Sequence, residues 1–380
     1  MDFELSEELQ MLRDMARDFS AEKIAPYADE WDENHYFPYE EAIKPMAELG
    51  FFGTVIPEEY GGNEMGWLAA MILTEEIARA SSSLRVQINM QTLGCAYTVL
   101  RYGSEEVKKK YIPKLVSAEY IGAFAITEPN AGSDAASIQT TAILEGDEWV
   151  INGTKHFITS GSIASVVVVM AKTDKSKGAK GISAFIVEKG TPGLKYGVEE
   201  DKLGLRGSVT AELIFEDCRV PKENLLGELN MGFIGAMNIL DRGRTAIGAM
   251  SVGIAQGALE QSIAYAKQRE QFGKPISKFQ AIQWMIADMA TEIEAARLLV
   301  MRAAYLEDKG ERFTREAAMA KLFASEMATR AARKAIQIHG GYGYMKDLPL
   351  ERFFRDVKLC EIGEGTSEVQ RMVIARQLGL

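Results

Sequence analysis

The spacing of apolar residues predicts that the first third of the chain is helical. Apolar residues recur there at intervals of three and four, as at Leu5, Leu9 and Leu12. This period is typical of amphipathic helices that bury one side. Helix breakers such as Pro38 and Pro57 divide the segment, so we expect several helices of ordinary length.

A different pattern begins near residue 122 and continues to about residue 227. Short runs of β-branched and aromatic residues, such as 149–151 and 166–170, are separated there by turn residues. Because no helical pattern lies between the runs, they favour an antiparallel β domain over a Rossmann unit. Gly146-Asp147 and Asn152-Gly153 predict tight turns.

The helical period returns from Asn230 onward, in long segments that include 244–269, 280–309 and 314–339. The chain is therefore predicted to be an α+β protein in the order α, β, α. A length of 380 residues suits two or three domains. We place the expected domains at residues 1–121, 122–227 and 228–380.

Composition and charge exclude several classes of function. The 43 basic and 54 acidic residues give a net charge of -11, which disfavours binding to nucleic acid. Three widely spaced cysteines, Cys95, Cys218 and Cys360, suit neither a disulfide framework nor a metal site, and they fit a reducing compartment. Three scattered histidines provide no metal centre.

The chain also lacks the patterns of targeting and membrane segments. It opens with neither a secretory nor a transit profile, so we expect a cytoplasmic protein, or a mitochondrial matrix protein if a leader was removed. The most apolar run, 166–171, is far shorter than the roughly 20 residues that span a bilayer. We therefore expect no membrane span.

Three segments carry candidate chemistry. Residues 125–134 are rich in small and hydrogen-bonding groups, which suit a phosphate or the edge of a flavin, although an ordinary loop is the alternative. Residues 337–344 contain three glycines after a helix, where a helix C-cap is the alternative. In 362–370, a capping box formed by Ser367 and Gln370 would place Glu364 on a loop before a helix, facing either a cavity or solvent.

Together these segments resemble the signatures of the acyl-CoA dehydrogenases, at residues 125–137 and 337–356 and at the Glu-Gly-Thr of 364–366. The resemblance covers the whole chain. It implies an N-terminal helical domain, a middle antiparallel β-barrel-like domain and a C-terminal four-helix bundle. The length is typical of the dehydrogenase branch and not of the longer oxidases.

The resemblance implies FAD as cofactor and a homotetramer in which subunits share FAD sites. Phe157 would cover one flavin face, where many relatives have tryptophan, and Thr159 would approach the flavin N5. Other residues would contact the flavin or its pyrophosphate, namely Phe124, Ile126, Thr127, Gly132 and Ser133. Residues that would serve the neighbouring subunit's FAD or its adenosine part are Arg269, Gln271, Phe272, Gln280, Gln337, Gly341, Thr366 and Glu368.

The resemblance also implies a mechanism. Glu364 would remove the α-proton of an acyl-CoA while the β-hydride leaves to the flavin, and electron-transferring flavoprotein would accept the electrons. Asp241 and Arg244 resemble the CoA-binding turn, and Ser133 would also lie near CoA. Related monooxygenases, nitroalkane oxidases and non-catalytic homologues typically alter the base or this turn, and both are present in this chain.

The acyl group is less clearly indicated. Gly363 stands where straight-chain enzymes usually carry tyrosine, so with Gly365 it would leave room beside the substrate for a ring. Arg85, Asn89 and Thr92 form a polar stripe at helical spacing, and Arg85 would suit a terminal carboxylate or, alternatively, an ion pair between helices. We expect an alicyclic substrate such as cyclohexane-1-carboxyl-CoA. Glutaryl-CoA or a short or branched acyl-CoA is the alternative.

Overall fold

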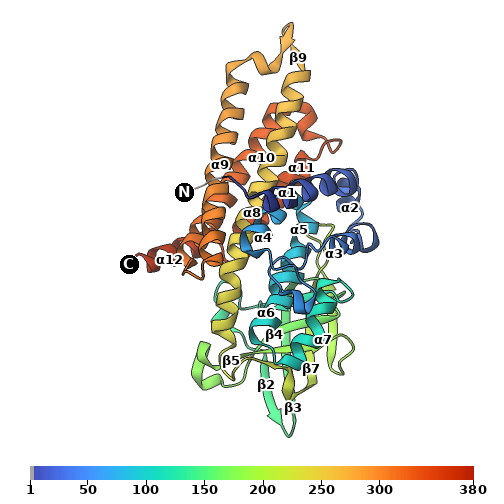
Figure 1. Cartoon of the computed structure of the whole chain (residues 1–380), viewed down its shortest axis with the longest axis vertical. Helices are drawn as coiled ribbons and strands as arrows, with labels where there is room; N and C mark the ends of the chain where they lie inside the picture. Colours follow the sequence, from blue (N-terminus) through green and yellow to red (C-terminus); the bar gives the residue numbers. More distant parts are fainter. Residues whose placement is uncertain (1–3) are drawn as a thin grey trace.

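The computed structural model describes residues 4–380, and its N-terminal part is helical, as predicted (Figure 1). Two consecutive segments of this part, α5 and the π-helical η4, are buried along most of their length, unlike α1, which buries little more than Leu12 and Ala16. The elements are α1 (Glu7–Phe19), α2 (Ala28–Glu33), α3 (Lys44–Glu48), α4 (Gly66–Ala80), α5 (Ser82–Ile88), η4 (Asn89–Tyr97), α6 (Thr98–Tyr102) and α7 (Glu105–Val116).

The middle part is an eight-stranded sheet with the order β6-β7-β3-β2-β4-β5-β8, and β1 pairs with β4. The strands are β1 (Gly122–Ala125), β2 (Thr141–Glu145), β3 (Glu148–Thr159), β4 (Val166–Lys172), β5 (Ile182–Glu188), β6 (Leu194–Glu199), β7 (Thr210–Pro221) and β8 (Leu225–Leu226). Most pairs are antiparallel, but β1 and β2 both run parallel to β4, so the wholly antiparallel domain was wrong in this detail.

Only one of the two predicted tight turns is present. Gly146-Asp147 joins β2 to β3, with a positive φ at Gly146. Asn152-Gly153 instead lies inside β3, at a shift of register against β7, so that prediction was wrong. The Gly153 backbone packs against Thr140, where a Cβ would lie 2.4 Å from the Thr140 hydroxyl. A β-bulge therefore uses the glycine that the sequence assigned to a turn.

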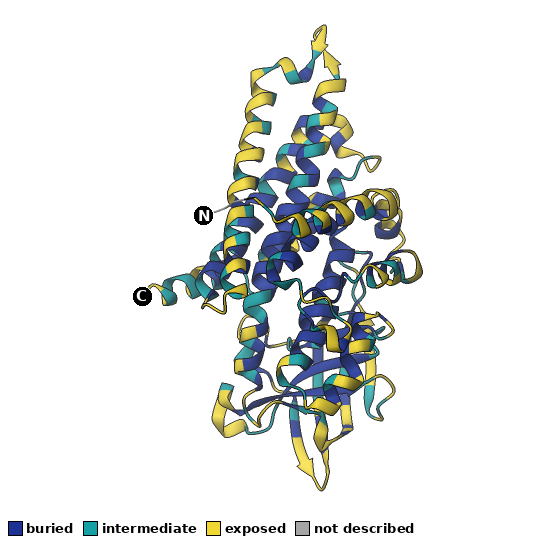
Figure 2. Ribbon diagram, viewed as in Figure 1, coloured by how far each residue is buried: buried dark blue, intermediate teal, exposed yellow. Residues whose placement is uncertain are grey.

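The C-terminal part consists of long helices, as predicted. They are α8 (Gly232–Gln268), α9 (Gln280–Asp308), α10 (Thr314–His339), α11 (Leu350–Ile362) and α12 (Ser367–Gln377). A short hairpin of β9 (Glu270–Gln271) and β10 (Lys274–Pro275) joins α8 to α9 at one end of the long axis, far from the β2–β3 turn at the other (Figure 1). Figure 2 shows that this end is largely exposed, whereas α8 is buried through the middle of the molecule.

The core links the three parts. Alternate residues of β4 enter different clusters: Val166 and Val168 belong to the large cluster that also contains residues of η4, α8 and α10, whereas Val167 and Val169 belong to a cluster within the sheet. Because both faces of β4 are buried, its sequence is a continuous apolar run and does not alternate. One face of the sheet therefore shares a core cluster with both helical parts. The boundaries 1–121, 122–227 and 228–380 stay predictions.

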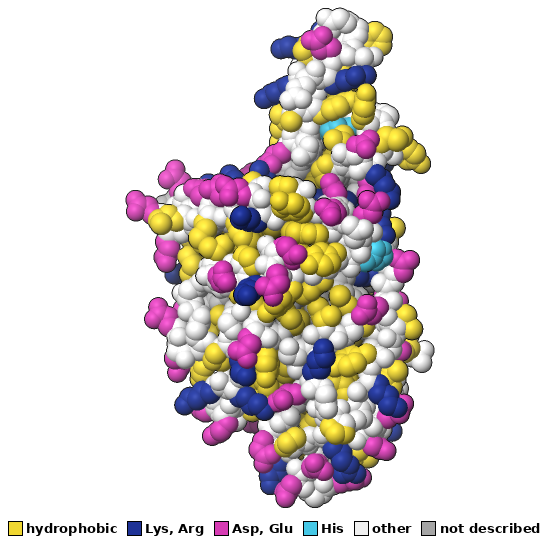
Figure 3. Space-filling model, turned by 90° about the vertical axis from the view of Figure 1, so that its right-hand side faces the viewer, with side chains coloured by type: hydrophobic (Ala, Val, Ile, Leu, Met, Phe, Trp, Pro, Cys, Tyr) yellow, Lys and Arg dark blue, Asp and Glu magenta, His cyan; other side chains and the backbone are white. Residues whose placement is uncertain are grey.

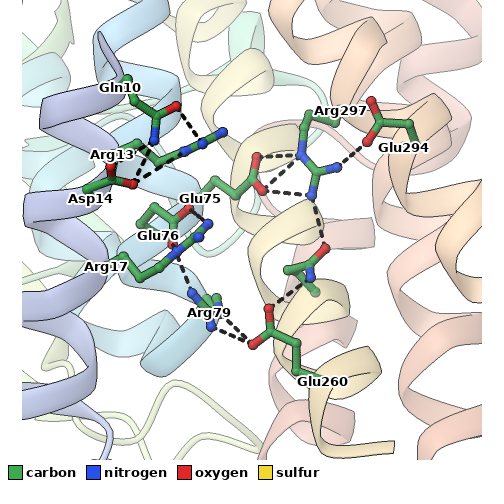
Figure 4. Close-up of polar contacts among 11 residues, drawn as sticks. Gln10, Arg13, Asp14, Arg17, Glu75, Glu76, Arg79, Glu260, Glu294 and Arg297 are labelled. Carbon is green, nitrogen blue, oxygen red and sulfur yellow. Dashed lines mark hydrogen bonds and ion pairs between the residues drawn. The ribbon is translucent and has the colours of Figure 1, made fainter. Parts of the chain in front are cut away.

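Charged side chains join the helices around α4. Glu75 of α4 accepts hydrogen bonds from Arg297 of α9, and Glu76 accepts from Arg17 of α1 and Arg79 (Figure 4). Arg79 also donates to Glu260 of α8, so these partly buried pairs connect α1, α4, α8 and α9. On the face shown in Figure 3, acidic and basic side chains are interspersed, with hydrophobic side chains gathered between them.

Within residues 4–380, no helix combines the length and apolar character needed to cross a bilayer. The same residues contain no cluster of three or more histidine, cysteine, aspartate or glutamate side chains placed to hold a metal ion.

Candidate active site

Glu364 lies in the tight turn between α11 and α12. Glu364 and Gly365 both have left-handed backbone conformations, with φ of 55° and 96°. The cap of α12 is Thr366, whose hydroxyl accepts a hydrogen bond from the Val369 N–H, so the predicted capping role of Ser367 was wrong by one residue. Gln370 reaches back to the carbonyls of Glu364 and Gly365, at 3.2 and 2.8 Å, and not to a cap N–H.

The Glu364 carboxylate is fixed on one side and free on the other. Its Oε1 accepts a hydrogen bond from Asn89 Nδ2 at 2.8 Å. Its Oε2 is shielded from solvent and has no hydrogen-bond partner among the described residues. That oxygen packs on Gly243 of α8, where a Cβ would lie 1.5 Å away. The site therefore presents one unpartnered carboxylate oxygen, held in place by an amide and a glycine.

Burial and charge act in opposite directions on this carboxyl. Burial raises the pKa of Glu364, while the positive charge of Arg85, the hydrogen bond from Asn89, and the charges of Arg244 and Lys321 lower it. The net pKa lies above the ordinary value of 4.5. A carboxylate with a raised pKa is a stronger base than an exposed one.

Arg85 of α5 is fully buried and forms no ion pair within 4.0 Å among the described residues, although the charge of Glu364 acts on it. Its Nη1 contacts Met250 Sδ at 3.4 Å, and its Nε and Nη2 have no partner among the described residues. Burial lowers the pKa of Arg85 to about 10, so it is still charged at neutral pH. No ion pair between helices is formed by Arg85 within 4.0 Å among the described residues. Buried guanidinium nitrogens without hydrogen-bond partners are costly, and the carboxylate of a ligand would pair with them.

The segment that follows Arg85 connects the base to the sheet. Gln87 accepts a hydrogen bond at 2.8 Å from the hydroxyl of Ser160, the residue that follows Thr159. Gln91 accepts one from the Gly122 N–H at 2.6 Å, at the start of β1. Thr92, by contrast, donates to the Phe52 carbonyl, so it serves the packing of helices and not the polar stripe. Asn89, which contacts Glu364, therefore lies on a segment that is hydrogen-bonded to the start of β1 and to the residue after β3.

The predicted flavin residues lie at the ends of β1 and β3. Thr127 follows β1, and its carbonyl accepts a hydrogen bond from the His156 N–H at 2.9 Å, so the loop lies beside Phe157. Phe157 has a φ of 57° and is 60% exposed. A phenylalanine held in a strained conformation with its ring in the open fits a planar ligand.

The remaining residues of this group are placed compatibly. Phe124, Ile126 and Thr159 are half-buried. No atom lies within 4 Å of the position that a Cβ would take at Gly132, so a phosphate could approach the backbone beside Ser133. The residues at this end of the sheet therefore fit an isoalloxazine ring and its pyrophosphate.

Sequence reasoning missed a buried ion pair beneath this loop. Lys155 of β3 is fully buried and donates to the Ile126 carbonyl at 3.0 Å and to Glu128 Oε1 at 2.8 Å. Glu128 also accepts from the N–H groups of Gln139 and Thr140. These bonds fix the backbone that carries Ile126 and Thr127. A lysine within a strand was the only sequence signal for them.

A second group of predicted residues lies near the β9–β10 hairpin, far from Glu364. Arg269, Gln271 and Gly341 line a cavity of about 520 Å³ between the hairpin and the end of α10. Phe272 at the tip is 92% exposed, and Gln280 and Gln337 are exposed as well. Thr366 and Glu368 instead lie at the start of α12. The hairpin lies at the opposite end of the molecule from the sheet, so the predicted residues around it do not meet the flavin residues of the same chain (Figure 1).

The predicted CoA turn lies on α8 beside Gly243. Arg244 donates to Asp241 Oδ1 at 2.5 Å, and Asp241 Oδ2 accepts from Thr314 at 2.7 Å. The Arg244 Nε is buried without a partner among the described residues. The contact of these residues with CoA stays a prediction, as do the roles of Gly363 and Gly365.

Three consecutive family profiles cover nearly all of the chain. They describe the N-terminal domain of acyl-CoA dehydrogenase at residues 6–119, the middle domain at 123–218 and the C-terminal domain at 230–379. The chain belongs to the acyl-CoA dehydrogenase family. The expected family, enzyme class and fold class are thereby confirmed, and FAD is the cofactor of this family.

Relatives match over their full length. The glutaryl-CoA dehydrogenase of Desulfococcus multivorans is 51% identical, covering 100% of this chain and 99% of that protein. The mitochondrial short-chain specific acyl-CoA dehydrogenase of Mus musculus is 50% identical, covering 99% and 91%. A solved glutaryl-CoA dehydrogenase in complex with glutaryl-CoA is 50% identical, with a TM-score of 0.97, covering 100% and 97%.

We expect Gly243→Ala to impair catalysis without removing the cofactor. The added methyl group would overlap Glu364 Oε2, so the carboxylate must move, and a displacement of about 1 Å can cost roughly 10²-fold in rate. Anaerobic stopped-flow reduction of the bound flavin measures this loss. Gly235→Ala on the same helix is the control, because its Cβ would come no closer than 3.2 Å to Tyr102. Equal rates in the two variants would contradict the placement of the carboxylate.

Proposed function

We propose that the chain dehydrogenates a short acyl-CoA thioester whose acyl group ends in a carboxylate, as in glutaryl-CoA. The observation that carries this proposal is Arg85, which is fully buried and charged and has two nitrogens without partners among the described residues. Asn89, which contacts Glu364, lies four residues after Arg85. A substrate whose α-carbon lies at Glu364 would therefore have the far end of its acyl group near Arg85. The relative solved with glutaryl-CoA agrees with this substrate class.

The alicyclic thioester expected from the sequence has less support. The space beside Gly363 is compatible with a ring, since a Cβ there would meet only ordinary contacts with Leu359. However, a neutral ring would leave the Arg85 nitrogens without hydrogen-bond partners in the interior, whereas a carboxylate would pair with them. A cyclic substrate is therefore the second candidate, and an unbranched short acyl-CoA would be turned over less efficiently.

Glu364 is the general base in this proposal. Its Oε2 accepts the α-proton of the thioester, while Asn89 holds Oε1 and thereby fixes the plane of the carboxylate. Bound FAD supplies the acceptor for the β-hydride, so that an enoyl-CoA leaves the site. A positioned base contributes roughly 10² to 10⁴ in rate. Phe124, Ile126, Thr127, Phe157 and Thr159 would hold the ring at the end of the sheet, where Lys155 fixes the loop.

We further propose that the FAD site is completed by a second copy of the chain, within a homotetramer. The exposed residues around the β9–β10 hairpin lie at the opposite end of the molecule from the sheet (Figure 1). They can therefore reach a flavin only in a neighbouring subunit. The electrons would leave to electron-transferring flavoprotein.

An anaerobic titration tests the proposed function. The purified protein should be yellow, and glutaryl-CoA should bleach its flavin absorbance at a lower concentration than butyryl-CoA or cyclohexane-1-carboxyl-CoA. A protein that none of the three thioesters reduces would contradict the dehydrogenase activity. Preferential bleaching by the cyclic thioester would contradict the carboxylate substrate and leave the activity in place.

A further inference from the structure

Lys321 of α10 is a buried cation that the proposed mechanism does not use. Its side chain is fully buried, and its Nζ donates a hydrogen bond to the Gly365 carbonyl at 2.8 Å. That carbonyl belongs to the residue immediately after the proposed base. A lysine is rarely buried unless it is paired, so its placement on this turn needs an explanation.

The turn that Lys321 contacts is conformationally strained. Glu364 has a φ of 55°, a region that residues with a side chain seldom occupy, so the surrounding structure must hold it there. Two donors do so: Lys321 binds the Gly365 carbonyl, and the Gln370 amide binds the carbonyls of both Glu364 and Gly365. Both donor side chains are fully buried. The direction of the Glu364 side chain therefore depends on these bonds.

Lys321 also contributes charge to the site. Burial lowers the pKa of Lys321 to about 8, so the ammonium form still predominates at neutral pH. The groups that face it are Cys360 and Glu361 of α11, Glu364, and Arg244 of α8. The cations that face Glu364 come from three helices, and they are Arg85 of α5, Arg244 of α8 and Lys321 of α10.

We propose that Lys321 is a positioning residue for the base: it holds the turn through the Gly365 carbonyl and places a buried positive charge beside the Glu364 carboxylate. This inference rests on the proposed function, because it takes Glu364 as the base. Lys321 touches neither the substrate nor the reacting atoms. Its effect should therefore appear in the rate and pH dependence of proton removal, and not in substrate affinity.

The test compares Lys321→Met with Lys334→Met in the FAD-bound enzyme. Lys334 lies on the same helix and pairs with Asp288 and Glu292, away from the turn. In Lys321→Met, we expect unchanged FAD content and KM, and a fall of roughly 10- to 100-fold in flavin reduction by glutaryl-CoA. Loss of the cation raises the pKa of the carboxyl, so the acidic limb of the pH profile should move to higher pH. Lys334→Met should keep the wild-type limb.

A second variant separates geometry from charge. Gln370→Leu removes the amide donor and keeps the ammonium, so the reduction rate should fall without a shift of the acidic limb. Gln370→Leu also tests whether these hydrogen bonds position the base if Lys321→Met does not fold. A wild-type reduction rate in Gln370→Leu would then overturn the positioning role. A Lys321→Met enzyme with wild-type rate and limb, or with lowered thermal stability alone, would overturn it directly.

The result for Glu364→Gln separates failure of the positioning role of Lys321 from failure of Glu364 as the base. If that variant is inactive while Lys321→Met behaves as wild type, only the positioning role fails. If Glu364→Gln is still active, the base lies elsewhere and the proposed mechanism fails, whatever the lysine variant does.

Discussion

Glu364→Gln is expected to fold, bind FAD and lose at least roughly 10²-fold in the rate of flavin reduction, the loss typical of a missing general base. The amide keeps the shape of the side chain and can still contact Asn89, but it cannot accept the α-proton. Anaerobic stopped-flow absorbance with the best thioester measures the loss. Glu326→Gln, which removes a surface ion pair with Arg371 on neighbouring helices, is the control and should reduce its flavin at the wild-type rate.

Near wild-type reduction in Glu364→Gln would place the base on another carboxylate. Glu128 and Asp134 are the next ones along the flavin loop. Glu128 is a poor candidate, because Lys155 and the Gln139 and Thr140 amides keep its pKa below the ordinary value. Asp134 is tied to the Ser137 hydroxyl.

The pH dependence provides a further check on Glu364. The base works as a carboxylate, and burial raises its pKa above 4.5, so the reduction rate should rise with pH and reach a plateau above that raised pKa. The acidic limb should therefore lie at a higher pH than that of an exposed glutamate, and Glu364→Gln should lack it.

The order of helical and β segments was predictable because it follows from local periodicity. The segment predicted at 314–339 coincides with α10, and the segment predicted at 280–309 ends one residue after α9. The place of Glu364 on a loop before the last helix was predictable for a different reason, since it lies in a short glycine-flanked signature that resembles a known family. In both cases the information is contained in neighbouring residues.

Features that depend on distant contacts were not predictable. The parallel pairing of β1 with β4 joins strands about 40 residues apart, and the bulge at Gly153 exists because Thr140 packs on that backbone. Lys321 looked like any helical lysine, since its burial depends on the turn at Gly365, which is 44 residues away. Gly243 likewise matters only because Glu364 packs against it.

Arg85→Met is expected to separate the candidate substrates. If the substrate is glutaryl-CoA, the variant leaves its carboxylate unpaired in a buried site, which costs about 3 to 5 kcal/mol, or roughly 200- to 5,000-fold in kcat/KM. Butyryl-CoA lacks this carboxylate and should keep most of its kcat/KM, so it is the internal control. Arg85 also lowers the pKa of Glu364, so the comparison belongs on the high-pH plateau, where this second effect vanishes.

The matched change at Gly363 tests the alicyclic alternative on the same three thioesters. Gly363→Tyr keeps an allowed backbone, because φ is -64°, and it would fill the space beside the α-carbon. If the pocket accommodates a ring, Gly363→Tyr should abolish activity on cyclohexane-1-carboxyl-CoA, and Arg85→Met should leave that activity unchanged. If the pocket accommodates a carboxylate, Arg85→Met should abolish activity on glutaryl-CoA, and the wild-type enzyme should have little activity on the cyclic thioester. Because Arg85 forms no hydrogen-bonded ion pair among the described residues, the thermal stability of Arg85→Met should stay close to that of the wild type in either case, so lost turnover reports on the substrate.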